Sequence, residues 1–167
     1  MVALLAERHG GTLRKGREKA LVGELRFDGR FVAVAYPQTY VNLSGESVTR
    51  LVRRYGIEDL SRLVVVHDEL DLPMGRVKVK VGGGTAGHNG LESIKAHLHS
   101  SDFVRVRVGI GKPPGRQAGA DFVLRRPGKA ARAELDVAVQ EAADAVELIL
   151  QEGAGPAMNR FNTTPPS

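Results

Sequence analysis

Residues 63–71 read LVVVHDELD, and this stretch decides the fold class. The apolar run at 63–66 is continuous, which is typical of a central strand covered on both faces. It ends abruptly in the segment HDELD at 67–71, in which four of the five residues are polar. Because ligands of open α/β sheets bind at the carboxyl ends of the strands, Asp68 is a candidate site residue. A simple turn acid is the competing interpretation of Asp68.

Helix and strand patterns alternate on both sides of this stretch. Residues 20–27 and 31–36 predict a β-hairpin, because the Asp28-Gly29 pair between them is a strong turn signal. Residues 76–81 alternate strictly and predict a strand with one cationic face. The pattern also predicts a strand over 104–110, a Pro- and Gly-rich loop over 112–119, and helices over 1–7, after Ser44, after Gly90 and over 129–151.

These elements indicate an α/β fold. We expect a single domain over residues 1–162, built as a mixed twisted β-sheet flanked by helices, and a loose tail over 163–167. The chain of 167 residues contains no cysteine, so a disulfide framework and a thiolate metal site are excluded. No apolar stretch reaches membrane-spanning length.

The basic residues are unevenly distributed. Residues 128–152 hold six acidic and two basic side chains, which leaves 22 basic and 13 acidic residues elsewhere, a surplus of nine positive charges. Such a surplus suggests a polyanionic partner. A surface that is basic without any specific partner is the alternative.

The segment 82–87 satisfies the pattern G-x-G-x-x-G after a predicted strand and before a predicted helix. This pattern raises the possibility of a dinucleotide cofactor. The context argues against it, because the preceding strand is half cationic and Asp102 comes before the next strand rather than at its end. A flexible crossover is the other interpretation, although His88 and Asn89 at this turn make a plausible binding corner. For Asn42 the competing interpretation is a helix N-cap.

Four motifs, in the family's order and close to its spacing, resemble those of bacterial peptidyl-tRNA hydrolases. They read YVNLSG at 40–45, HDELDLP at 67–73, GGGTAGHNGL at 82–91 and FVRVRVGIG at 103–111. The resemblance runs from the first residues to about residue 162, with Val41 in place of the usual methionine. It implies an enzyme that hydrolyses the ester between peptide and tRNA in peptidyl-tRNA released prematurely from ribosomes, so that tRNA is recycled.

The resemblance also implies roles for single residues. Asp68 would orient and electrostatically support a histidine base, while Asn42 and Asn89 would hold the substrate carbonyl and the attacking water. Tyr40 would pack near the peptide, and His88 would support substrate binding. Hydrolysis of an activated ester needs no metal or other cofactor. Phosphates of the tRNA would contact four basic residues on two strands: Lys78, Lys80, Arg105 and Arg107.

In the family, a Gly-Asn-Pro-Gly strand end and a Thr-Arg-His-Asn segment precede the first helix and supply a specificity asparagine and the catalytic histidine. Residues 1–8 match the later part of that helix. We therefore expect this chain to begin beyond the base and to hydrolyse its substrate poorly. His88 is the best internal substitute, because His67 and Asp68 point to opposite faces of an extended stretch.

Three functional hypotheses result from the sequence. The first is a peptidyl-tRNA hydrolase that acts in translation, as a cytoplasmic monomer with peptidyl-tRNA as partner and no membrane association. The second is a non-catalytic relative that binds RNA. A dinucleotide-binding enzyme is the third and weakest.

Overall fold

The computed structural model describes residues 1–111 and 129–163. Its contacts group the chain into two compact units, each of which is described by itself. Unit 1 consists of Met1–Leu63 and Val81–Val104, and unit 2 of Val64–Lys80 and Arg105–Ser167. The expected loop at 112–119 and residues 164–167 of the expected tail lie outside the described residues. Among the helices that are described, none is long and apolar enough to cross a membrane.

The hairpin expected in unit 1 is confirmed. Strands β2 (Ala20–Phe27) and β3 (Arg30–Pro37) pair antiparallel, and Asp28 and Gly29 connect them. Both connecting residues have positive φ, 51° and 76°, as a two-residue type I′ turn requires. A short strand that the sequence pattern does not reveal, β1 (Arg14–Lys15), pairs with the other edge of β2.

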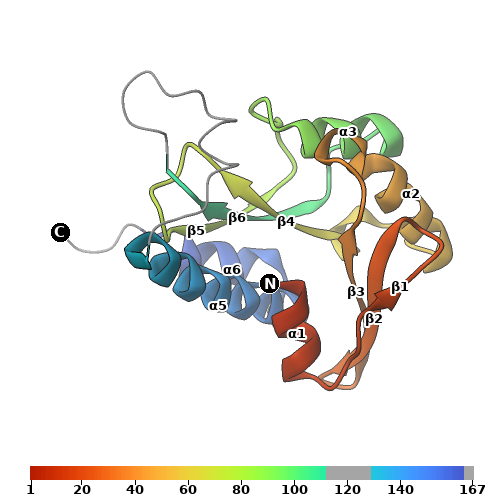
Figure 1. The fold of residues 1–167 in the computed structure, drawn as a ribbon, viewed down its shortest axis with the longest axis horizontal. Coiled ribbons are helices and arrows are strands. Elements are labelled where there is room, and N and C mark those ends of the chain that lie inside the picture. The colour runs from red at the N-terminus through yellow and green to blue at the C-terminus, as the bar shows by residue number, and fades with distance from the viewer. Residues whose placement is uncertain (112–128, 164–167) are drawn as a thin grey trace. The chain divides into compact units, whose positions relative to one another are not determined.

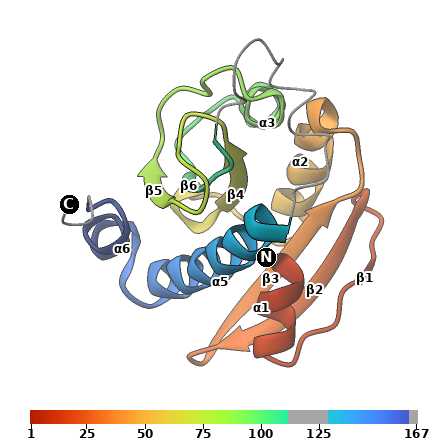
Figure 2. The ribbon, with the colours of Figure 1, turned by 60° about the vertical axis from the view of Figure 1, so that its left-hand side comes forward.

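Helices cover this sheet and extend unit 1. Helix α1 (Val2–Arg8) lies against β2 and β3, as Figure 2 shows. Helix α2 (Ser44–Arg54) packs along α3 (Asn89–Leu98), and the short 3-10 helix η1 (Val41–Leu43) also contacts α3 (Figure 1). The helices expected after Ser44 and after Gly90 are therefore present.

The second sheet has the strand order β4-β6-β5, formed by β4 (Val64–Glu69), β6 (Val104–Gly109) and β5 (Val77–Val81). Backbone bonds give the directions. Val104 N donates to Leu63 O (3.0 Å), and further along both strands Ile110 N donates to Glu69 O (3.1 Å). Because the residue numbers increase in the same direction on both strands, β4 and β6 are parallel.

Strand β5 runs against β6. The bonds from Gly109 N to Arg76 O (2.7 Å) and from Gly82 N to Phe103 O (3.1 Å) advance in opposite directions along the two segments. Because one neighbour of β6 is parallel and the other antiparallel, the expected mixed sheet is confirmed.

The expectation that the apolar run at 63–66 forms the central, fully covered strand is wrong within the described sheet. The central strand is β6, and all but one of its residues are buried, whereas Val64, Val65 and Val66 are half-buried. The error arises because the two arginines of β6 make its sequence look amphipathic, although one of them, Arg105, is only 1% exposed.

The rest of unit 2 is helical. Figure 1 shows helices α5 (Lys129–Glu152) and α6 (Ala154–Phe161) along one side of this sheet, and the two helices contact each other. Helix α5 agrees with the pattern at 129–151, but α6 was not expected, because glycine and proline interrupt its short sequence. The inner face of α5 is closely packed through small and branched residues: Ala138, Ala142, Ala145, Val146 and Ile149.

A polar cluster joins the end of α2 to the hairpin sheet in unit 1. The hydroxyl of Tyr55 donates to Glu24 Oε1 (2.9 Å). Arg54 pairs with Glu18 (3.0 Å), and the Arg54 guanidinium lies 4.9 Å from the centre of the Tyr55 ring. Burial of the Tyr55 phenol, together with its bond to the Glu24 carboxylate, raises the pKa of Tyr55 to about 12. The neutral phenol is therefore the form that the folded chain stabilises.

We expect a spectrophotometric titration of the folded protein to contain a tyrosinate step near pH 12 from Tyr55. Because the folded pKa exceeds the ordinary value of about 10, the stability contributed by this group is fully present below about pH 10 and is lost as pH rises through about 12. Tyr55→Phe should remove the step, whereas Tyr36→Phe should leave it in place. Retention of the step in Tyr55→Phe would contradict this assignment.

Candidate functional site

The residues singled out in the sequence fall into two groups. The first group lies in unit 1 and consists of Tyr40, Asn42, His88 and Asn89. The second group lies in unit 2 on strands β4, β5 and β6, and consists of Asp68, Lys78, Lys80 and Arg107.

The first group is held together by a close contact between α2 and α3. Gly45, in the first turn of α2, has no room for a side chain, because an added Cβ would overlap the Ser93 carbonyl oxygen and the His97 ring. Its backbone N–H donates to Ser93 Oγ (2.9 Å), and this bond is buried. The last residue of the YVNLSG motif therefore has a packing role, which brings η1 onto the beginning of α3.

Asn42 and Asn89 occupy adjoining segments. Asn42 is the middle residue of η1, Asn89 is the first residue of α3, and both side chains are exposed. The side chain of Val41 lies 3.3 Å from the position that a Cβ on Gly90 would take, so these two neighbours of the asparagines pack together. The chain thus presents two exposed amides from adjoining backbone segments.

The N-cap interpretation of Asn42 is not supported. Helix α2 begins after Leu43 and has no side-chain cap, and the hydroxyl of Ser44 donates to Val41 O (2.7 Å). Helix α3 does have a side-chain cap, because Nδ1 of His88 accepts from the backbone N–H groups of Gly90 (3.1 Å) and Leu91 (3.2 Å).

This cap defines what the His88 ring can do. Since Nδ1 accepts two backbone bonds, it is unprotonated, and the proton of the neutral ring is on Nε2. The ring is then a donor at Nε2 rather than a general base at that atom. His88 thus orients the beginning of α3, and this cap argues against its use as a substitute base.

Apolar side chains border Asn42. Tyr40 is 81% exposed and Val41 59% exposed, and Leu43 on the other side of Asn42 is also exposed. Large apolar side chains that stay exposed next to exposed amides are typical of a binding surface. The sequence pattern singled out only Tyr40, because it shows residue type but not exposure.

At the carboxyl end of β4, buried and exposed side chains alternate. His67 and Glu69 are buried, whereas Asp68 is exposed. The expected opposite orientation of His67 and Asp68 is therefore confirmed, and Nδ1 of His67 bonds to the backbone carbonyl oxygen of Asp68 at 2.8 Å. The carboxylate of Asp68 faces away from this ring.

Arg107 on β6 does not present a free charge. Its guanidinium pairs with the buried Glu69, with Nη2 and Nε each 3.4 Å from Oε2. The parallel pairing of β4 and β6 brings these residues together, and sequence spacing alone could not have shown it. Part of the Arg107 charge is thus compensated within unit 2.

Arg105 cannot contact tRNA phosphates in this structure, which corrects the expectation from the sequence. The residue is 1% exposed in the central strand β6. Burial lowers the pKa of the Arg105 guanidinium, and the like charge of Arg107 lowers it further. Alternation along the strand did not reveal this burial, because both faces of β6 are covered.

Strand β5 keeps the expected cationic face. Val77 and Val79 are buried, while Lys78 is half-buried and Lys80 is exposed. Within the described residues, neither lysine has an acidic partner within 4.0 Å. These two ammonium groups are therefore candidates for binding an anionic ligand.

The dinucleotide hypothesis conflicts with the topology. The Gly-rich segment at 82–87 follows β5, which is an edge strand of the sheet as far as the structure describes it and runs antiparallel to its neighbour β6. A dinucleotide-binding loop follows a strand of a parallel sheet, so that the next helix crosses over to another parallel strand. The loop instead leads to the His88 cap of α3.

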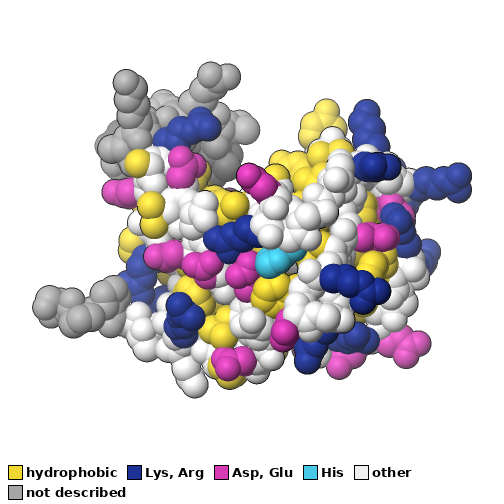
Figure 3. All heavy atoms as spheres, turned by 90° about the horizontal axis from the view of Figure 1, so that it is seen from below, with side chains coloured by type: hydrophobic (Ala, Val, Ile, Leu, Met, Phe, Trp, Pro, Cys, Tyr) yellow, Lys and Arg dark blue, Asp and Glu magenta, His cyan; other side chains and the backbone are white. Residues whose placement is uncertain are grey.

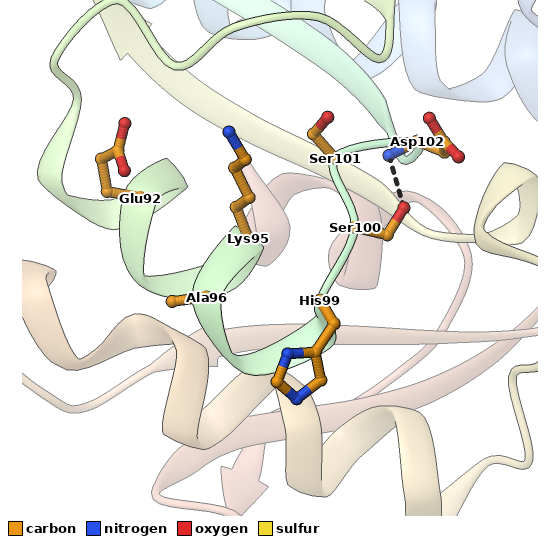
Figure 4. Close-up of a pocket in the computed structure, with 7 residues that line it drawn as sticks. All are labelled: Glu92, Lys95, Ala96, His99, Ser100, Ser101 and Asp102. Atoms are coloured by element: carbon orange, nitrogen blue, oxygen red, sulfur yellow. Dashed lines mark hydrogen bonds between the residues drawn. The ribbon is translucent and has the colours of Figure 1, made fainter.

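A polar hollow of about 600 Å³ lies at the other end of α3, and Figure 4 shows the residues that line it. It contains none of the candidate site residues Tyr40, Asn42, Asp68, His88 and Asn89. Across the part of the chain that the structure describes, no three His, Asp or Glu side chains are grouped so that they could hold a metal ion. The lining of the hollow is Glu92, Lys95, Ala96, His99, Ser100, Ser101 and Asp102.

Positive and negative side chains are intermixed on the face drawn in Figure 3. Lys and Arg side chains lie there among Asp and Glu side chains and hydrophobic areas. The basic surplus of the sequence is therefore not gathered into one continuous area on this face.

Comparison with known proteins shows the family. The model of the family described as peptidyl-tRNA hydrolase matches residues 1–167. The chain belongs to this family. It is 49% identical over 162 residues to the peptidyl-tRNA hydrolase of Frankia casuarinae, with 97% of this chain and 82% of the relative covered, and 48% identical to that of Nocardia farcinica, with 95% and 82% covered.

The family fold is also supported by solved structures. The chain matches the crystal structure of peptidyl-tRNA hydrolase from Acinetobacter baumannii with a TM-score of 0.90 and 34% identity, covering 99% of this chain and 84% of that one. The α/β class and the resemblance found in the sequence are confirmed. The expectation that the chain is impaired as a hydrolase is not borne out by these comparisons, and the chain spans 82–84% of the length of the relatives named here.

Proposed function

We propose that this protein hydrolyses the ester that joins a peptide to tRNA in peptidyl-tRNA. Membership of the family supports the reaction, and one structural observation supports the site: two exposed amides, Asn42 and Asn89, on adjoining segments held together by the packing of Gly45 on Ser93. Apolar side chains beside the amides suit a peptide, and the ammonium groups of Lys78 and Lys80 suit phosphates.

The proposed chemistry matches the groups available. An ester is already activated, so hydrolysis requires a positioned water, a base near neutral pKa and donors for the negative charge that develops on the carbonyl oxygen. An asparagine amide donates without carrying a charge of its own, and its oxygen can accept from water. We assign these tasks to Asn42 and Asn89.

Asp68 has the electrostatic task in this proposal. Its exposed carboxylate would orient an imidazole base and stabilise the imidazolium that forms when the base takes a proton from water. We assign the base to neither His67 nor His88, because the first residue is buried and Nδ1 of the second caps α3.

The two ends of the substrate would contact different residues. Tyr40, next to Asn42 and 81% exposed, would pack on the peptide. Lys78 and Lys80 would bind tRNA phosphates, with Arg107 as a weaker contributor because Glu69 compensates part of its charge. We further propose that the protein acts as a monomer in the cytoplasm, where translation produces peptidyl-tRNA.

The direct test is a cleavage assay on N-blocked aminoacyl-tRNA with the protein as its natural host makes it. We expect release of tRNA at a rate proportional to protein concentration, measured by separating charged from free tRNA. A light-scattering measurement of the molar mass of the same sample tests whether the protein is a monomer. Binding of tRNA without cleavage would favour the non-catalytic RNA-binding relative, and absence of both would overturn the proposal.

The lysine assignment predicts a change in salt dependence. Replacing both Lys78 and Lys80 by alanine should weaken tRNA binding and reduce the slope of log Kobs against log salt concentration by about 1 to 2, since each phosphate contact contributes about 0.7 to 0.9. Fluorescence anisotropy at several salt concentrations measures both quantities. The matched control replaces Arg14 and Lys15, which are exposed on β1. An equal loss of slope in the control would contradict specific contacts on β5.

A further inference from the structure

We infer that Asn162 is a positioning residue for the tRNA-binding lysines, and this inference rests on the proposed function. Asn162 directly follows α6, more than 80 residues along the chain from β5. Its side-chain amide makes two bonds to one residue of β5: Oδ1 accepts from Val79 N at 2.8 Å, and Nδ2 donates to Val79 O at 2.8 Å. All of these residues belong to unit 2.

The Asn162 amide bonds the backbone groups of Val79 that a neighbouring strand would otherwise bond. In the described sheet, β5 is an edge strand with β6 on one side only. An edge strand has backbone N–H and C=O groups directed away from the sheet, and the planar amide of Asn162 satisfies one of each at the same residue. The amide therefore constrains both the position and the rotation of the backbone at Val79.

Val79 lies between the two lysines of the cationic face. Its side chain is 2% exposed, whereas the neighbouring side chains of Lys78 and Lys80 emerge on the opposite face of the strand. A rotation or shift of the Val79 peptide groups would change the spacing and direction of both ammonium groups. Phosphates along a nucleic-acid backbone have a regular spacing, so a fixed separation of the lysines favours binding of both.

The residue type is informative. Aspartate in place of Asn162 would keep the acceptor for Val79 N but lose the donor to Val79 O, and alanine would lose both. Neither change touches a lysine. Asn159, an exposed amide on α6, provides a matched control for which the structure gives no bond to β5.

The test compares Asn162→Ala, Asn162→Asp and the control Asn159→Ala with wild-type protein. We expect both Asn162 variants to raise Kd for tRNA and KM for N-blocked aminoacyl-tRNA on the order of fivefold, with little change in kcat, whereas Asn159→Ala matches wild type. A short ester substrate that carries only the terminal nucleoside should be cleaved by the Asn162 variants as by wild type, because it makes no contact with the lysines.

A double-variant measurement separates positioning from a purely structural role. In a Lys78→Ala, Lys80→Ala background, Asn162→Ala should cause no further loss of tRNA affinity, since the groups that it positions are gone. Equal damage to short and long substrates, additive losses of affinity, or unchanged Kd with a lowered Tm would overturn the inference. Failure of the wild-type protein to cleave or bind tRNA would instead refute the proposed function, so the two outcomes are distinguishable.

Discussion

Asp68→Asn is expected to lower kcat for peptidyl-tRNA hydrolysis on the order of 100-fold. The substitution keeps the shape of the side chain and removes its negative charge. Without this charge the imidazolium that forms during proton abstraction is no longer stabilised, and the ring is no longer held in the orientation that accepts a proton from water. Since Asp68 is exposed, the substitution should leave folding intact. Single-turnover cleavage measures the chemical step directly.

The control for this prediction is Asp136→Asn, which removes the same charge from an exposed position on α5. We expect it to retain wild-type kcat. Equal Tm values for the two variants would exclude unfolding as the cause of the loss. If Asp68→Asn kept more than half of the wild-type kcat, the role given to this carboxylate would have to be abandoned.

Gly45→Ala is expected to lower the free energy of unfolding by about 3 kcal/mol, the upper part of the range for overpacked interiors. The added methyl group would overlap the backbone carbonyl oxygen of Ser93 as well as the His97 ring. A side chain can change rotamer, but the backbone of α3 can move only if the helices separate. Separation would also break the buried bond from Gly45 N to Ser93 Oγ. Denaturation by urea gives the free-energy difference.

Gly155→Ala is the matched control, because Gly155 also lies near the beginning of a helix, α6, and an added Cβ there meets no atom within 4 Å. We expect it to be neutral or to stabilise the protein by up to about 1 kcal/mol, since alanine favours the helix. Similar losses in both variants would mean that helix propensity, and not the contact with Ser93, determines the effect. If Asn42 binds the substrate as proposed, Gly45→Ala should also lower activity, because separation of α2 from α3 would displace η1, which contains Asn42.

Much of the fold could be predicted from local pattern. Asp28-Gly29 predicted the hairpin, because only a few residue types accept positive φ at both turn positions. Strict alternation predicted β5, and apolar spacing predicted α2, α3 and α5. The order of the four motifs predicted the family, and the match over residues 1–167 confirmed it.

Other features were missed because they depend on contacts between distant segments. Arg105 and Arg107 look equivalent in the sequence, yet one is buried in the central strand and the other pairs with Glu69 across the parallel strands. His88 looks like a candidate base, but the turn that precedes α3 makes it a cap. The contribution of Gly45 appears only once Ser93 of another helix lies against it.

The sequence by itself determined the local conformations and the family, since both are recorded in residue types at short and fixed spacing. The tertiary structure alone decided which strand is central, which charges are compensated and which backbone groups a remote amide such as Asn162 bonds. The physical reason is that propensity and periodicity act within a few residues along the chain. Burial and charge compensation depend on neighbours that chain folding brings together from far apart.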